Sequence, residues 1–541
     1  MVSIAEHLLC QGELTERSLN NTLYNWPRKA GLNAQQTLDS SRAINVGTLL
    51  PLRIECAAMR TALIALLLGL LGLPASAQRA SSFAPEVREL IKVDAPVIAL
   101  THVKLIDGTG APERADQTLV INDGRIQAVG DAARTPAPAG ARVLDLTGYS
   151  VLPGLVGMHN HLFCIVATGR TPLVKNAEWS FSRLYLAMGV TTIRTTGCIE
   201  PYTDLNLKKL IDQGVLPGPQ MFVTAPYLQG DNPGRGYFQL HQLSGPEEAR
   251  RMVEYWADAG ATSFKVYTHV TRAELGAAVE VAHRRGLKVT GHLCSIGYRE
   301  AAALGIDNIE HGFMEDSEFV SGKQPDRCPD RMEELKSLEA LDVNSAPVQE
   351  MFRDLISHRV AVTSTLPVFE AAIVERPFPQ RALEVMVPEW RARVLASMVD
   401  AAGPANATRT ALLTSLLKKG MQLERAFAKA GGMLLAGSDA VGIGGVLAGF
   451  ADLREIEMLV AAGFTLVEAI RIATFNGAQF LGESKRIGTV EVGKQADLVV
   501  VRGDPAAKIT DIEKVETVFK DGIGYDSAKL IDSVRGLVGL Q

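Results

Sequence analysis

The sequence predicts an α/β fold in which a (β/α)8 TIM-type barrel is joined to a small β-sandwich formed from both ends of the chain. Two patterns support this prediction. Residues 151–482 alternate short apolar strands with amphipathic helices, as parallel strands joined by crossover helices do. Residues 98–147 and 488–522, on either side, are rich in β-branched residues and turns. The chain of 541 residues is long enough for one large barrel and a smaller domain.

The barrel prediction rests on short apolar segments separated by helical patterns. Helices are expected between the strands, for example at 246–260 and 272–286. A long, mostly helical insertion at 366–432 separates the last two strands, and a segment of that length commonly forms a lid or an interface. The strand candidates lie at 151–161, 191–197, 219–225, 263–269, 288–293, 308–312, 359–365 and 433–439.

The two ends of the chain share a sequence pattern typical of β-strands. Near the N-terminus, Asp-Gly pairs at 107–108 and 123–124 break the alternating segments, as hairpin turns do. Residues 488–505 and 515–522 have the same strand-like pattern. We therefore expect the sandwich to combine an N-terminal part with a C-terminal part, which span residues 78–150 and 483–541 around the barrel at 151–482.

The first part of the chain is predicted to contain a signal peptide for export, preceded by an N-terminal extension. Met59-Arg60 precedes an apolar run of 12 residues from Ala62 to Leu73, and Ala75-Ser76-Ala77 follows. A positive start, a short apolar core and an A-x-A site predict a signal peptide at 59–77 that is cleaved after Ala77. The run is too short for a stable membrane span, which needs about 20 residues. Residues 1–58 are then a non-native extension, and the mature protein is periplasmic or secreted.

Charge and cysteine usage narrow the class of function. The formal net charge is −5, which argues against nucleic acid and favours a small-molecule substrate. Cys164, Cys198, Cys294 and Cys328 remain after the signal, and four scattered cysteines predict neither a disulfide framework nor a cysteine metal site.

Polar side chains fall at the ends of several predicted barrel strands. In such a barrel, residues at the carboxyl ends of the strands face the active site. Residues i and i+2 of a strand point to the same side, so the first strand directs two imidazoles together, as a divalent metal requires. Each residue alone could be a core imidazole, a helix cap or a lysine reaching solvent. Together they predict a metal site; they are His159, His161, Lys265, His292, His311 and Asp439.

The order of these residues resembles the amidohydrolase superfamily, as do two flanking motifs. VLPGLVGMHNH at 151–161 is similar to the family's first-strand motif, and GKQADLVVVRGDP at 493–505 is similar to its C-terminal sandwich. The resemblance covers about residues 98–525. It implies two divalent metal ions, for which zinc fits the nitrogen and oxygen ligands best, and a homo-oligomer.

The resemblance also implies a role for each site residue. His159, His161 and Asp439 would bind the more buried metal, and His292 and His311 the second. Lys265 would be carbamylated and bridge the two metals, which requires a neutral amine that burial favours. The metals would lower the pKa of a bridging water to give a hydroxide, with Asp439 as general base and then general acid. The implied reaction is hydrolysis of an amide C–N bond.

Within the superfamily, the sequence resembles the group that cleaves dipeptides and N-acyl amino acids, some of whose members hydrolyse ochratoxin A. GMHNHLF, FKVYTH and GHLCSIGYREAAALGIDNIEHG carry that likeness. A substrate of this kind has a free carboxylate that needs a donor near the metals. The candidate substrate-binding residues are Tyr267, His269, Tyr237 and His241.

Three alternatives remain. A deaminase of the superfamily would have one metal and a Glu a few residues after the fifth-strand histidine, whereas here the first Glu after His292 is Glu300. A cyclic amidase or imidazolone-type hydrolase shares most of the ligands and is harder to separate. A non-catalytic assembly protein on this fold would have lost metal ligands, and none is missing from this sequence.

Overall fold

The computed structural model describes residues 80–539 except 169–170, 232–238, 372, 374–378, 402, 404–405 and 443–444. The predicted extension at 1–58 and signal peptide at 59–77 lie outside the described residues. Residues Ser76–Gln541 form one compact unit. No helix of the described residues is long and apolar enough to cross a membrane.

Parallel strands form the centre of the described unit, in a three-stranded sheet ordered β11-β10-β7 and a five-stranded sheet ordered β12-β13-β14-β15-β16. A parallel bridge between Leu228 and Val266 links the two sheets on one side. On the other side, the backbone N–H groups of Ser438 and Asp439 donate to the His159 carbonyl at 3.1 and 2.9 Å. The strands are β7 (Leu155–Asn160), β10 (Val190–Thr195), β11 (Gln220–Phe222), β12 (Ser263–Val266), β13 (Lys288–Gly291), β14 (Asn308–Glu310), β15 (Ala361–Ser364) and β16 (Leu434–Ala436).

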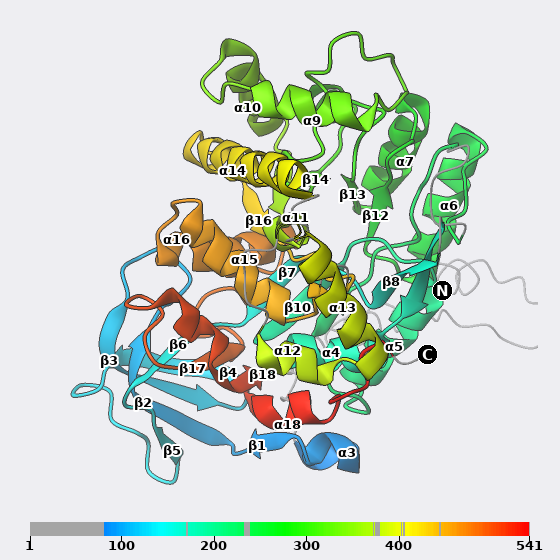
Figure 1. Ribbon diagram of the computed structural model, residues 1–541. Coiled ribbons are helices and arrows are strands. Elements are labelled where there is room, and N and C mark those ends of the chain that lie inside the picture. The colour runs from blue at the N-terminus through cyan, green and yellow to red at the C-terminus, as the bar shows by residue number, and fades with distance from the viewer. Residues whose placement is uncertain are drawn as a thin grey trace, which may run out of the picture. The chain divides into compact units, whose positions relative to one another are not determined.

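Helices follow most of these strands along the chain, which gives an α/β fold of the TIM-barrel type (Figure 1). Helix α7 begins with a capping box, in which the Thr271 hydroxyl and the Glu274 carboxylate satisfy the exposed backbone N–H groups. The helices between β7 and β15 in the sequence are α4 (Glu178–Ala187), α5 (Pro201–Asp212), α6 (Pro246–Ala259), α7 (Arg272–Arg284), α8 (Tyr298–Ala303), α9 (Arg331–Ala340) and α10 (Ala346–Ser357).

The predicted insertion at 366–432 is mostly helical in its described residues, as expected. It contains α11 (Leu366–Glu370), α12 (Gln380–Val385), α13 (Pro388–Ala401) and α14 (Ala407–Lys429). The chain continues through α15 (Phe450–Ala461), α16 (Leu466–Arg471), the π-helix η4 (Ile472–Asn476) and α17 (Gly477–Phe480). An antiparallel hairpin of β8 (Phe163–Thr168) and β9 (Thr171–Asn176) follows β7, where the sequence predicted only a loop.

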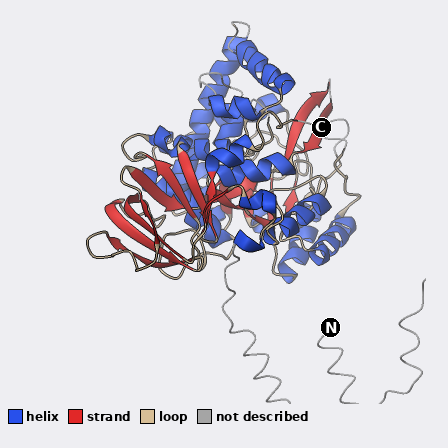
Figure 2. Ribbon diagram, turned by 90° about the horizontal axis from the view of Figure 1, so that it is seen from below, coloured by secondary structure: helices blue, strands red, loops and turns tan. Residues whose placement is uncertain are grey.

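The two ends of the chain pair in one nine-stranded sheet ordered β1-β19-β18-β17-β6-β2-β3-β4, with β5 pairing β2. C-terminal β17 pairs antiparallel with N-terminal β6, so the prediction that both ends build one β-structure is confirmed. In Figure 1 the blue strands lie beside the red ones, and Figure 2 shows these strands gathered on one side of the helices. Division into the two facing layers of a sandwich, and the domain bounds, stay predictions. The strands are β1 (Ile91–Val93), β2 (Val97–Leu105), β3 (Arg114–Asn122), β4 (Arg125–Asp131), β5 (Arg142–Asp145), β6 (Tyr149–Pro153), β17 (Leu498–Arg502), β18 (Val515–Lys520) and β19 (Ile523–Asp526).

Side-chain alternation along β17 explains how this sheet is held to the rest of the unit. Leu498 and Val500 pack into a cluster of sheet side chains from both chain ends. Val499 and Val501 point to the other face and join the large core around the helices. All four are buried, and each such side chain contributes about 1.5 to 3 kcal/mol. The short elements η1 (Ala80–Ser82), α3 (Pro85–Arg88), η5 (Ile509–Glu513) and α18 (Ser527–Asp532) complete the described unit.

Candidate metal centre

The six predicted ligands come together at the carboxyl ends of the parallel strands. His159 lies in β7 and His161 directly after it, Lys265 lies in β12, and the others follow β13, β14 and β16. The ring centroids of His159 and His161 are 5.2 Å apart, those of His159 and His311 4.5 Å, and those of His292 and His311 4.3 Å. Lys265 Nζ lies 3.3 Å from His159 Nε2. The structure therefore brings all six side chains together around one site.

Asp439 is the carboxylate on which the imidazoles converge. Its Oδ1 lies 3.1 Å from His161 Nε2 and 3.5 Å from His159 Nε2, and its Oδ2 lies 3.9 Å from His311 Nδ1. Burial opposes ionisation, but the three histidines hold the pKa of Asp439 well below its usual range. The close approach of β16 to β7 requires Gly437, because a Cβ there would lie 2.3 Å from His159 Cβ.

Two of the histidines are oriented by acceptors behind them. His159 Nδ1 lies 2.7 Å from Glu310 Oε2, and His161 Nδ1 lies 3.2 Å from the Gly197 carbonyl. A carboxylate and a carbonyl only accept, so each Nδ1 carries a proton, and in the neutral ring Nε2 keeps the lone pair that a metal needs. Burial lowers the pKa of His161 to about 4, which keeps that ring neutral near pH 7.

Glu310 is a buried site residue to which sequence reasoning gave no role. Besides His159, it accepts from Arg194 Nη2 at 2.6 Å and from the Thr290 hydroxyl. Burial disfavours the charged carboxylate, yet Arg194 and His159 together lower the pKa of Glu310. Its position directly before the sixth-strand histidine was visible in the sequence, but only the fold brings it to β7.

The second pair of histidines is less tightly enclosed. His311 is buried, and its Nδ1 lies 3.0 Å from the Thr365 hydroxyl. His292 is 18% exposed, and its Nε2 lies 3.8 Å from Glu315 Oε2, beyond a hydrogen bond. Burial, together with His292 and His159, holds the pKa of His311 well below its usual range.

Lys265 is the cation that the strand buries. It is 1% exposed, and burial lowers its pKa to about 8. The neutral amine is therefore far more accessible than for a lysine in water.

The donor set fits a divalent metal ion. One atom from each of His159, His311 and Asp439 lies within 4.8 Å of the other two, so a single ion could contact all three. Imidazole nitrogens with a carboxylate oxygen suit zinc and related ions. His311 and Asp439 have φ of 69° and 47°, a left-handed backbone that side chains other than Gly seldom adopt. Strain of this kind clusters at functional sites.

The predicted substrate residues separate into two groups. The Tyr267 ring lies 5.0 Å from that of His292, so this residue is at the site. The strand predicted at 263–269 ends at Val266, so His269 lies beyond β12. Its Nδ1 contacts the Thr268 hydroxyl at 2.9 Å. His241 is exposed, and its Nε2 contacts Glu248 Oε1 at 2.9 Å, not a candidate ligand. Tyr237 lies outside the described residues.

An apolar cluster borders the histidines. It contains Phe163, Val174, Tyr227 and Val441, with Tyr267 against it. The Phe163 ring lies 4.5 Å from that of His161, and Lys265 Nζ lies 5.3 Å from the centre of the Tyr227 ring. Tyr227 gave no signal in the sequence.

One disulfide bond joins Cys294 to Cys328, with 5.1 Å between their Cα atoms. The sequence predicted no disulfide framework, and a single pair across 34 residues is not one, but the pairing itself was missed. Cys294 is two residues after His292, so the bond tethers the loop that carries this histidine. Cys164 and Cys198 are free and buried.

Fold and donor set together define a class of α/β proteins with a metal site at the carboxyl ends of parallel strands. A family profile for the amidohydrolase family matches residues 150–523. The chain belongs to that family, which confirms the predicted resemblance and supports a hydrolase that acts on C–N bonds.

Several solved structures share the fold. A structure described as a prolidase from Bifidobacterium longum is 26% identical, with 81% of this chain and 98% of that chain covered and a TM-score of 0.58. A Xaa-Pro dipeptidase with bound methionine is 21% identical, with 80% and 100% covered and a TM-score of 0.59. Ochratoxinase from A. niger is 20% identical, with 80% and 96% covered and a TM-score of 0.56.

Matches to curated proteins are shorter. An imidazolonepropionase from Nocardia farcinica is 36% identical over 107 residues, which are 19% of this chain and 26% of that protein. A 5'-deoxyadenosine deaminase from Methanobrevibacter smithii is 36% identical over 59 residues, 11% of this chain and 14% of that protein. The chain thus spans about a quarter or less of the length of these relatives.

Proposed function

We propose that this chain is a metal-dependent amidohydrolase that cleaves the amide bond of an N-acyl amino acid or a dipeptide-like substrate, ochratoxin A among the candidates. The observation that carries the proposal is the convergence of His159, His161, Lys265, His292 and His311 on Asp439, the carboxylate between them. Two parallel sheets that close into one barrel of eight strands would hold this arrangement, with the sandwich beside it.

The chain would hold two divalent ions, with zinc the best fit. We assign His159, His161 and Asp439 to one ion and His292 and His311 to the other, with Lys265 as a bridging carbamate. His311 also lies close enough to His159 and Asp439 to share their ion. When bound, such ions activate water and polarise a carbonyl. The depressed pKa of Lys265, about 8, supports this role, because only the neutral amine can take up carbon dioxide.

Asp439 is the residue we assign to proton transfer. Its low pKa makes it a carboxylate at neutral pH, and it contacts imidazoles of both predicted metal groups. It would accept a proton from the attacking water and return it to the leaving nitrogen, so that one group serves both halves of the reaction. Glu310 would position His159 without touching the substrate.

An aromatic wall supports the substrate class. Phe163, Tyr227 and Tyr267 lie beside the histidines and offer apolar surface to an acyl group or side chain. The fold neighbours described as a Xaa-Pro dipeptidase and an ochratoxinase act on bonds of this type, and their likeness supports the proposal. Tyr267 remains our candidate to bind the substrate carboxylate, with His269, Tyr237 and His241 as weaker candidates.

Substrate release assays test the proposal most directly. Purified, metal-loaded enzyme is incubated with dipeptides, N-acyl amino acids and ochratoxin A, and free amino acid is measured. We expect release from at least one class, and two metal equivalents per chain. Lys265→Ala should lose activity and metal, whereas Lys288→Ala, at the exposed start of the neighbouring strand β13, should lose neither. Full activity of Lys265→Ala would refute the bridging role.

A cyclic amidase or imidazolone-type hydrolase is the second candidate, because a segment of the chain matches an imidazolonepropionase. Ring opening without amino-acid release would favour it, and ammonia release would favour a deaminase. Export through the signal peptide at 59–77 and assembly into a homo-oligomer complete the proposal. N-terminal sequencing of exported protein and light scattering test these two points.

A further inference from the structure

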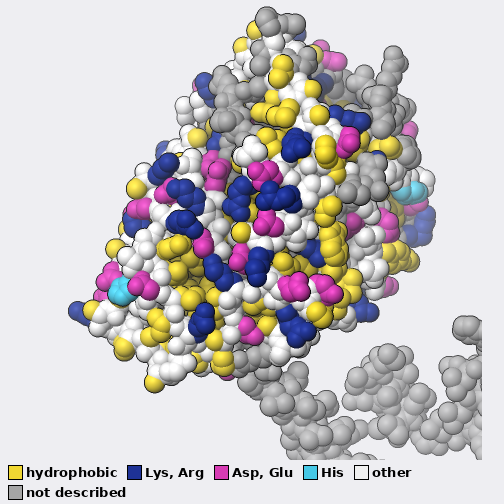
Figure 3. Space-filling model, turned by 60° about the horizontal axis from the view of Figure 1, so that its bottom comes forward, with side chains coloured by type: hydrophobic (Ala, Val, Ile, Leu, Met, Phe, Trp, Pro, Cys, Tyr) yellow, Lys and Arg dark blue, Asp and Glu magenta, His cyan; other side chains and the backbone are white. Residues whose placement is uncertain are grey.

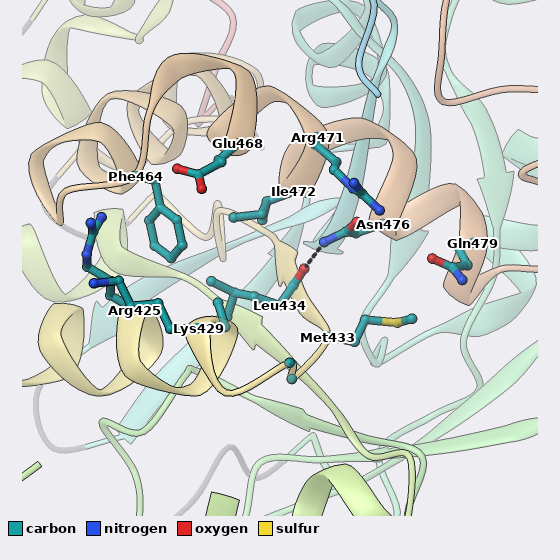
Figure 4. Close-up of a pocket in the computed structure, with 13 residues that line it drawn as sticks. Arg425, Lys429, Met433, Leu434, Phe464, Glu468, Arg471, Ile472, Asn476 and Gln479 are labelled. Carbon is teal, nitrogen blue, oxygen red and sulfur yellow. Dashed lines mark hydrogen bonds between the residues drawn. The ribbon is translucent and has the colours of Figure 1, made fainter. Parts of the chain in front are cut away.

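A cavity lies at the start of β16, and Figure 4 shows residues that line it. Its volume is about 370 Å³, within the range of about 300 to 1,000 Å³ that is usual for small-ligand pockets. Leu434, the first residue of β16, lines it, whereas Asp439 follows the other end of that strand. None of the six candidate ligands lines the cavity, so it is separate from the metal centre.

Cationic side chains dominate the rim of this cavity. Arg425, Lys429 and Arg471 line it together with one carboxylate, Glu468, which leaves a net charge of +2 (three cations minus one anion). Glu468 Oε2 is engaged by Thr465, whose backbone N–H and hydroxyl donate to it at 2.7 and 2.8 Å. The hydrogen bonds from Thr465 hold this carboxylate at the start of α16, and together with the charges of Arg425 and Lys429 they lower its pKa, so it offsets one of the three positive charges.

The three cations differ in how the protein holds them. Arg471 Nη1 donates to the Thr109 carbonyl at 3.1 Å, which fixes that side chain. Among the described residues, no hydrogen bond or ion pair engages the guanidinium of Arg425 or the amine of Lys429; the Arg425 guanidinium lies 5.6 Å from the centre of the Phe464 ring. Both residues come from the last turns of α14, one helical turn apart.

The walls behind the cations are apolar. Phe464, Ile472 and Leu434 are buried and line the cavity, and Met433 adds a flexible side chain. One wall is the π-helix η4 (Ile472–Asn476), a rare element that is frequent at functional sites. Asn476, at its end, donates from Nδ2 to the Leu434 carbonyl at 2.8 Å, as Figure 4 shows. The cavity therefore has a fixed apolar floor and a charged entrance.

We propose that this cavity binds a small organic anion, with its carboxylate at Arg425 and Lys429 and its apolar body against Phe464 and Ile472. An apolar pocket with a few convergent polar groups is the usual architecture of a small-ligand site. A guanidinium and an amine suit a carboxylate, because both donate charge-assisted hydrogen bonds. This site does not depend on the hydrolase activity proposed above.

Calorimetric titration with benzoate tests the proposal, with benzamide as the neutral analogue of the same shape and inorganic phosphate as an anion without an apolar body. We expect saturable benzoate binding and binding of benzamide and phosphate at least about tenfold weaker. Arg425→Gln/Lys429→Gln should weaken benzoate binding by at least about tenfold. Lys418→Gln, an exposed lysine of the same helix that does not line the cavity, should leave it unchanged.

Because carboxylates also bind metals, the titration is repeated with Asp439→Ala, which removes a ligand of the metal centre. Benzoate binding that survives in Asp439→Ala and falls in Arg425→Gln/Lys429→Gln supports the proposal. The reverse pattern places the anion at the metal centre and overturns it, as do absent binding and equal binding of phosphate. Circular dichroism checks the fold of each variant, and Lys429→Gln alone provides a milder second test with the same expected direction.

Discussion

The candidate metal centre has two halves, one with His159 and His161 and the other with His292 and His311. They differ in how the protein holds them. His159 is fully buried, and a chain of contacts at 2.7 and 2.6 Å connects it through Glu310 to Arg194. His292 is 18% exposed, and its nearest carboxylate, Glu315, lies 3.8 Å away. The first half is thus preorganised by hydrogen bonds to a buried carboxylate, whereas in the second half His292 is partly exposed.

This difference has a chemical meaning. A ligand whose orientation is fixed before the metal arrives loses little freedom on binding, so the His159 half should bind its ion more tightly. The aromatic wall borders both halves, because Tyr267 lies against His292 and Phe163 lies against His161. A more open ion can change its ligands when a substrate arrives, so the asymmetry fits a division between a structural and a reacting ion.

The largest effect is expected at Asp439, which contacts both halves. Asp439→Asn keeps the size of the side chain but removes the charge that His159, His161 and His311 stabilise. Loss of a general acid–base group costs about 10²- to 10⁴-fold in rate. We expect kcat to fall at least about 10³-fold, measured on variant protein with its metal content determined. Asp342→Asn, an exposed aspartate on the surface, is the control. Activity within about tenfold of wild type would exclude the proton-transfer role.

The disulfide that tethers the His292 loop should give the next largest effect, on stability. Cross-linking Cys294 to Cys328 closes a loop of 34 residues, which corresponds to about 3 to 4 kcal/mol in the chain-entropy account. Cys328→Ser should lower the free energy of unfolding by about this amount in denaturant titrations. Reductant should destabilise wild type to the same level and leave Cys328→Ser unaffected. Equal stability with and without reductant in wild type would show that the bond does not form.

Matched substitutions at Glu310 and Glu315 test the asymmetry itself. Loss of a partner behind a metal-bound histidine costs about 10- to 100-fold in metal affinity. Glu310→Gln should show this loss for the tighter ion, because the carboxylate contacts His159 Nδ1 at 2.7 Å. Glu315→Gln should change metal affinity by less than about threefold. Competition with a chelator measures both, and equal losses would contradict the division of the site.

The smallest expected effect is a pH dependence from Asp316, next to Glu315. Burial, followed by the nearby Glu318, raises the pKa of Asp316 to about 8. Because the folded state holds this proton more tightly than the unfolded state, the associated stability is present below about pH 4 and is lost as the pH rises to about 8.

Asp316→Asn removes that titration, so its melting temperature should fall less than that of wild type between about pH 5 and about pH 8. Asparagine can still accept from the Glu318 backbone N–H, as Asp316 does at 2.9 Å. Asp342→Asn, an exposed aspartate that also accepts from an N–H two residues on, should leave the pH profile unchanged. Parallel profiles for Asp316→Asn and wild type would contradict the prediction.

The sequence predicted the strand-end ligands because hydrophobic periodicity locates strands, and position on a strand then decides which way a side chain faces. It could not find Glu310, since the contact with His159 joins residues 151 positions apart across the site. Tyr227 was missed for the same reason, because its packing is set by tertiary contacts. The hairpin β8–β9 instead pairs adjacent segments that were not predicted as strands. The predicted strand at 263–269 was too long, because β12 ends at Val266 and His269 lies beyond it.

Glu310, the last residue of β14, and His311, the residue after it, serve different halves of the metal centre. Glu310 supports His159, and the next residue, His311, belongs to the other half. Neighbouring residues of a regular strand point to opposite sides, but the left-handed φ of 69° at His311 breaks that alternation and lets both side chains face inward. Anyone who grafts this centre into a designed barrel must therefore build that irregular backbone first, because an ideal strand would orient only one of the two correctly.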